Sequence, residues 1–106
     1  MYSNPAQQGT NAARLDNRIM LQHNITSRSL GVFLIYAKDA GNWGGQPLVG
    51  GNVGGSLEDN GNLTQLKKVG LITTQEEKER GRPACVWIRF TDKGKALAAE
   101  YGIEIE

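Results

Sequence analysis

The residues of this chain best suited to chemistry form a short cationic run in its second half. The run consists of Lys78, Arg80, Gly81 and Arg82, followed by Pro83. Guanidinium and ammonium groups bind phosphate oxygens, and arginines on an extended backbone can follow a narrow minor groove of DNA. The alternative is a solvated turn whose cations pair with the neighbouring carboxylates, Glu76, Glu77 and Glu79. Both interpretations place this run at the surface.

A second set of polar side chains lies between the apolar positions of a predicted helix. This set is Asn60, Asn62, Thr64, Gln65, Lys67 and Lys68. Asparagine and glutamine can make paired hydrogen bonds to adenine edges in the major groove, and lysine can hold a phosphate. The competing explanation is that any amphipathic helix has such a polar face. The set therefore indicates a candidate DNA-binding helix without proving one.

Catalytic and metal-binding patterns find little support in the sequence. The glycine run of residues 50–55 is not followed by the Gly-Lys-Ser/Thr ending of a phosphate-binding loop. His23 is the only histidine and Cys85 the only cysteine, which makes a zinc site or an internal disulfide improbable. We therefore expect neither an enzyme nor a bound cofactor or metal.

Length and charge restrict the remaining choices. The chain has 106 residues, enough for one globular domain with its own core. Its formal net charge is only +1, so affinity for nucleic acid would have to come from local clusters of cations. No apolar run approaches the length of a membrane span, and we expect a cytoplasmic protein, associated with the nucleoid if it binds DNA.

The first half of the chain predicts an arm, an ambiguous segment and one clear helix. Residues 1–10 have a composition typical of a flexible arm, and residues 11–24 fit either a short helix or an extended segment. A helix should begin after Thr26 or Ser27 and end near Gly41. Because this helix is apolar nearly all round, the preceding segment or a second subunit must cover part of it.

The second half predicts a helix, a hairpin and a final helix. Glycines make residues 41–61 difficult to assign, after which a helix should run from Ser56 to Val69. Residues 71–75 and 84–90 predict two paired strands, with residues 76–83 at the tip. Thr91 or Asp92 should cap a last helix that ends at Gly102. Residues 103–106 fit an edge strand or a tail.

Residues 63–97 resemble the winged-helix transcription regulators of the MarR and PadR kinds. The resemblance consists of a leucine-rich helix, the turn Gly70-Leu71-Ile72, the charged hairpin tip and the segment Thr91-Asp92-Lys93-Gly94. It implies an α+β, mainly α fold: one winged-helix domain over residues 11–106, with three to four helices and a two- or three-stranded wing. The sequence Arg80-Gly81-Arg82-Pro83 is also the core of the AT-hook, whose backbone is extended.

By this resemblance, the chain is expected to be a small regulator that binds double-stranded DNA. The helix of residues 56–69 would enter the major groove, and the wing would lie on the backbone or in the minor groove. The long C-terminal dimerisation helices of such regulators are missing, so a homodimer would use the first helix or the N-terminal segment. The alternative is a winged helix that binds another protein, which Glu58 and Asp59 favour because they would repel phosphate.

Overall fold

The computed structural model describes residues 5–51 and 57–106, and side chains from residue 13 to 51 and from residue 61 onward. This part of the chain has an α+β, mainly helical fold, as the sequence predicted. In chain order its elements are α1 (Pro5–His23), α2 (Ser27–Asp39), the 3-10 turn η1 (Ala40–Asn42), α3 (Leu57–Lys68), β1 (Ile72–Glu77), β2 (Cys85–Phe90) and α4 (Asp92–Glu100). Such a fold is compatible with a winged helix.

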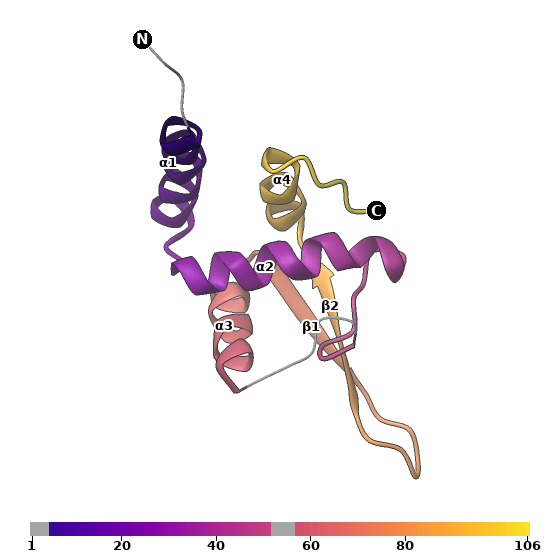
Figure 1. The fold of residues 1–106 in the computed structure, drawn as a ribbon. Coiled ribbons are helices and arrows are strands. Elements are labelled where there is room, and N and C mark those ends of the chain that lie inside the picture. Colours follow the sequence, from indigo (N-terminus) through magenta and orange to yellow (C-terminus); the bar gives the residue numbers. More distant parts are fainter. Residues whose placement is uncertain (1–4, 52–56) are drawn as a thin grey trace.

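Helix α2 is the central element of the core. In Figure 1 it crosses the molecule, with α3 and the hairpin on one side and α1 and α4 on the other. Thr26 caps it, since its side chain accepts a hydrogen bond from the Ser29 N–H. Phe33 and Tyr36 are almost fully buried. The rings of Phe33 and Phe90 form a T-shaped contact with a centroid distance of 5.6 Å. Helices α1 and α3 pack on this helix, and the contact between Phe33 and Phe90 joins it to β2.

Three of the helices end in the same hydrogen-bonded motif. Asn24, Gly70 and Gly102 follow α1, α3 and α4 with φ of 56°, 81° and 75°. The residue after each of them donates its N–H back to the helix, to the carbonyl of Met20, Leu66 and Ala98 respectively. These are Schellman endings, in which the left-handed residue satisfies the last carbonyls. The glycine signals at residues 70 and 102 were therefore interpreted correctly.

Strands β1 and β2 form an antiparallel hairpin, whose loop projects away from the helices (Figure 1). Ile72 pairs with Phe90, and Gln75 pairs with Trp87. Strand β1 extends two residues beyond its predicted end, through Glu76 and Glu77, whereas β1 and β2 each begin one residue later than predicted, so the loop comprises residues 78–84. The segment 47–49 also pairs with β2, through Ile88 N–H to Pro47 O at 2.9 Å and Val49 N–H to Val86 O at 2.8 Å. This hairpin, with its loop, is called the wing below.

Thr91 joins the end of α3 to the start of α4. Its side chain accepts a hydrogen bond from the Gly94 N–H at 3.0 Å, which caps α4. Its hydroxyl also lies 2.6 Å from the carbonyl oxygen of Gly70 and 3.0 Å from that of Leu71. The predicted cap at Thr91 is therefore confirmed. The Thr91 side chain, directly after β2, thus connects the residues that follow α3 to the first turn of α4.

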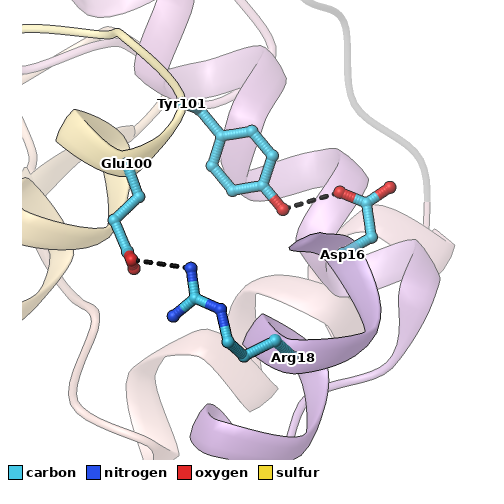
Figure 2. A network of polar contacts seen from close by, with 4 residues as sticks. All are labelled: Asp16, Arg18, Glu100 and Tyr101. Carbon is cyan, nitrogen blue, oxygen red and sulfur yellow. Dashed lines mark hydrogen bonds and ion pairs between the residues drawn. The ribbon is translucent and has the colours of Figure 1, made fainter. Parts of the chain in front are cut away.

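Helix α1 is held to the end of α4 by two polar contacts, shown in Figure 2. The Tyr101 hydroxyl donates to Asp16 Oδ1 at 2.6 Å, and Arg18 Nη2 donates to Glu100 Oε1 at 3.0 Å. Partial burial and the hydrogen bond to Asp16 raise the pKa of Tyr101. Since Ile19, which follows Arg18 in the chain, is fully buried, this part of α1 belongs to the core.

One further expectation differs from the structure, and two alternatives that the sequence left open are settled. Helix α1 begins at Pro5, so it includes residues 5–10 of the segment predicted to be an arm, while residues 1–4 lie outside the described residues. Its regular pattern continues to His23, which settles the ambiguity of residues 11–24 in favour of a helix. For residues 103–106 the structure shows the tail and not the edge strand, and Ile103 and Ile105 in this tail are half-buried. None of the described helices is both long and apolar enough to cross a membrane.

Candidate nucleic-acid interface

Helix α3 presents a small, polar face to solvent. Leu63 and Leu66 are buried against the core, whereas Gly61, Thr64, Lys67 and Lys68 are exposed. A spacing of three or four residues places the exposed residues on one side of the helix. Lys67 and Lys68 occupy its last turn, where positive charge also stabilises the helix dipole. Three of the predicted contact residues therefore share this face.

Asn62 and Gln65 lie on a different face of α3, which corrects the sequence prediction of a single polar face. Gln65 Oε1 accepts a hydrogen bond from Thr26 N at 3.0 Å and lies 3.3 Å from the Thr26 hydroxyl. Asn62 Oδ1 accepts one from Ser29 Oγ at 3.1 Å, and its Nδ2 is buried with no partner in the described part of the chain.

These contacts give the two amides a role inside the domain. Both belong to the junction between α3 and the start of α2, where backbone N–H groups have no partner within the helix. Their oxygens cannot contact a DNA base without leaving that junction. The sequence missed this because a polar residue at a helix contact has the same pattern as one facing solvent. The side chain of Asn60 is outside the described residues.

At the tip of the wing, the backbone turns sharply. The Arg82 N–H donates to the Glu79 carbonyl at 3.1 Å, and Gly81 has a φ of 81°. This geometry is that of a β-turn with Arg80 and Gly81 at its central positions. The extended backbone suggested by the AT-hook sequence is therefore absent here. Gly81 supplies the turn, and Arg80 stands at its outermost corner.

The cations of the wing are exposed, and two of them are paired. Lys78 Nζ lies 3.2 Å from Glu76 Oε1, and Arg82 Nη1 lies 3.5 Å from Glu79 Oε2. Because the side chains of both pairs are more than half exposed, each pair is easily exchanged for another partner. Arg80 makes no hydrogen bond or ion pair with the described residues. Among the three cations of the wing tip, Arg80 is therefore the one most available to an external anion.

Neither element has a large excess of positive charge. The wing carries four cations, Lys78, Arg80, Arg82 and Arg89, against three glutamates at positions 76, 77 and 79. Helix α3 carries Lys67 and Lys68 against Glu58 and Asp59. The cations are concentrated at the C-terminal end of α3 and at the wing tip. Any attraction to phosphate therefore depends on orientation and not on net charge.

The base of the wing contains an aromatic pair. The rings of Trp43 and Trp87 have centroids 5.7 Å apart and planes inclined by 70°. Trp43 Nε1 donates to Asp39 Oδ2 and Trp87 Nε1 donates to Glu77 Oε2, both at 2.9 Å. The sequence pattern could not pair the two tryptophans, because they lie far apart in the chain. The hydrogen bond between Trp87 and Glu77 agrees with the alternation of side chains in a strand, since Gln75 pairs with Trp87 and Glu77 lies on the same face two residues later.

No protein-family model matches the chain, and searches of curated proteins and of solved structures returned no significant match.

Proposed function

We propose that this chain is a small, sequence-specific protein that binds double-stranded DNA and regulates transcription. The observation that carries the proposal is the exposed face of α3, formed by Gly61, Thr64, Lys67 and Lys68. This helix continues within a few residues into a wing with cations at its tip. In a winged helix, these two elements contact the major groove and the adjacent backbone or minor groove.

The proposed roles follow from side-chain chemistry. Lys67, Lys68 and Arg80 bind phosphate oxygens, and Thr64 reaches a base edge. Gly61 leaves the middle of α3 without a side chain on this face, and a Cβ atom there would meet nothing within 4 Å. The fold does not require this glycine, which costs a helix interior about 1 kcal/mol. Close approach of DNA to the helix would account for it.

A homodimer bound to two half-sites is part of the same proposal, because the charge of one chain supports only modest affinity. Leu21 on α1 and Ile35 on α2 are large apolar side chains that are 85% and 51% exposed. A second copy of the chain that packed on α1 and α2 would bury both side chains. The protein would then act in the cytoplasm, associated with the nucleoid.

The second candidate function is a winged helix that binds another protein and not DNA. It is favoured by the small net charge of both contact elements and by the use of Asn62 and Gln65 inside the domain. In that case the exposed side chains would form a polar protein contact. Affinity for random duplex DNA at low salt separates the two functions.

The test measures fluorescence anisotropy of a random-sequence duplex across a salt series. The variants are Lys67→Ala with Lys68→Ala, and Arg80→Ala with Arg82→Ala. Each cation that contacts phosphate contributes about 0.9 to the slope of log affinity against log salt, so each double variant should lower the slope by up to about 1.8. The control is Lys38→Ala with Lys95→Ala, which removes the same charge from α2 and α4.

Three outcomes decide between the functions. A reduced slope in both test variants and an unchanged slope in the control support DNA binding by α3 and the wing. Equal reduction in all three variants indicates a general charge effect and contradicts the proposed face. If the native chain shows no binding at low salt, DNA binding is wrong and the protein-interaction function is favoured.

A further inference from the structure

A cavity of about 510 Å³ lies at the base of the wing, away from α3. One wall is formed by Trp43 and Gln46, which follow the end of α2, and the other by Gln75, Glu76, Glu77 and Trp87 of the hairpin. Its volume is in the range of small-molecule sites. Nothing in the proposed DNA contact uses these residues.

The two tryptophans form fixed aromatic walls. Both indole N–H groups are already bonded, to Asp39 and to Glu77, so neither ring can turn without losing a hydrogen bond. The inclined arrangement, with planes at 70°, makes a corner between the two rings. Since the N–H donors are occupied, what the indoles offer to a ligand is their electron-rich faces. Such faces attract cations.

The charge of the cavity lining is negative, which also favours a cation. Among the described residues that line the cavity, Glu76 and Glu77 are the only ones with ionisable side chains, and none is a lysine, arginine or histidine. Glu77 uses Oε2 to hold Trp87, which fixes one carboxylate beside the aromatic corner. Glu76 pairs with Lys78, but this ion pair is 75% and 53% exposed and can be exchanged. An anion would be repelled from this cavity, whereas a cation beside the indoles would meet the carboxylate of Glu77, which shares the face of Trp87.

The residues of the lining also favour an organic cation over a metal ion. Hard metal ions need several oxygen ligands, and the described residues contain no group of three or more histidine, cysteine or carboxylate side chains that could hold one. Indole faces favour weakly hydrated cations, of which methylated ammonium ions are the best example. We propose that the cavity between Trp43, Trp87 and Glu77 binds a small organic ammonium ion.

Choline and its neutral isostere 3,3-dimethyl-1-butanol test the charge requirement directly. The readout is the NMR signal of the two indole N–H groups, which belong to the only tryptophans of the chain. We expect both signals to shift on titration with choline, and choline to bind about tenfold more tightly than the alcohol. Equal affinities would overturn the proposal, and so would the absence of any shift up to about 10 mM choline.

Two isosteric variants test the site. Glu77→Gln keeps an oxygen that can accept the Trp87 N–H bond but removes the charge, and should weaken choline binding about tenfold. Glu79→Gln removes the same charge from the same hairpin but lies outside the cavity lining, so it should change the affinity less than about twofold. If both variants weaken binding equally, the effect is one of general charge and the proposed site is wrong. None of these outcomes depends on DNA binding.

Discussion

Gly94 lies directly against the backbone carbonyl of Leu71, so close that a Cβ atom at position 94 would overlap the Leu71 oxygen. The same carbonyl oxygen lies 3.0 Å from the Thr91 hydroxyl and accepts the Thr91 N–H at 3.2 Å. The start of α4 is therefore packed on the backbone that leaves α3. This contact explains why a threonine is followed three residues later by a glycine.

Gly94→Ala should destabilise the domain by about 3 kcal/mol, because the backbone of Leu71 or of α4 must move to make room. The free energy of unfolding measured in urea checks this. Gly61→Ala is the matched control, since it also adds one methyl group to a helical glycine but meets nothing within 4 Å. It should stabilise the domain by about 1 kcal/mol. A loss of stability in both variants would contradict the packing explanation.

Local signals account for most of what the sequence predicted correctly. Thr91, Gly70 and Gly102 act through hydrogen bonds within a few residues of themselves, so their types suffice to place helix ends. The hairpin was predicted in the same way, because apolar and other side chains alternate along residues 84–90 and a charged tip precedes them. These elements lie where expected, apart from shifts of one or two residues.

The features that the sequence did not give depend on contacts between distant residues. Asn62 and Gln65 have the types expected of a DNA-reading helix, but α2 binds them because its N-terminus lies beside α3. The Trp43 and Trp87 pair requires the loop after α2 to return to the hairpin. Periodicity identifies the faces of one helix, and it cannot tell which polar face another helix will cover.

Gln65→Ala should reduce stability by about 1 to 2 kcal/mol. The substitution removes the acceptor of the Thr26 N–H, which is left unpaired next to the cap of α2. Thermal unfolding of the variant and of Lys68→Ala, an exposed residue on the same helix, measures the effect. The lysine variant should change stability by less than about 0.5 kcal/mol. Equal, small effects would show that Gln65 contributes nothing to the junction.

The two contacts between α1 and α4 should differ in strength. Tyr101→Phe loses the 2.6 Å hydrogen bond to Asp16, which is charge-assisted and half-buried, and should cost about 1 to 2 kcal/mol. Arg18→Met keeps most of the side-chain stem and loses an ion pair whose side chains are 55% and 37% exposed. Solvent screening limits that loss to less than about 0.5 kcal/mol. Urea unfolding of both variants checks the order, and a larger loss in the arginine variant would contradict it.

His23 should make the stability of the domain depend on pH. Its side chain is 7% exposed at the end of α1, and Nδ1 has no hydrogen-bond partner in the described part of the chain. Burial lowers its pKa, and the positive charge of Lys93 adds to this, while Glu100 acts in the opposite direction. A lowered pKa means that the unfolded chain binds this proton more readily than the folded one.

Stability should therefore fall as the pH is lowered through the ordinary histidine pKa of 6.5 toward the lower value of the folded state. The midpoint of thermal unfolding, followed from about pH 7.5 to about pH 5.5, measures this loss. Since His23 is the only histidine, His23→Gln should make the profile flatter in this range, where carboxylates titrate little. Lys93→Met should show a smaller loss of stability on acidification than the native chain, because the repulsion between Lys93 and protonated His23 is removed while the burial of His23 remains. An equally steep profile in His23→Gln would mean that another group is responsible.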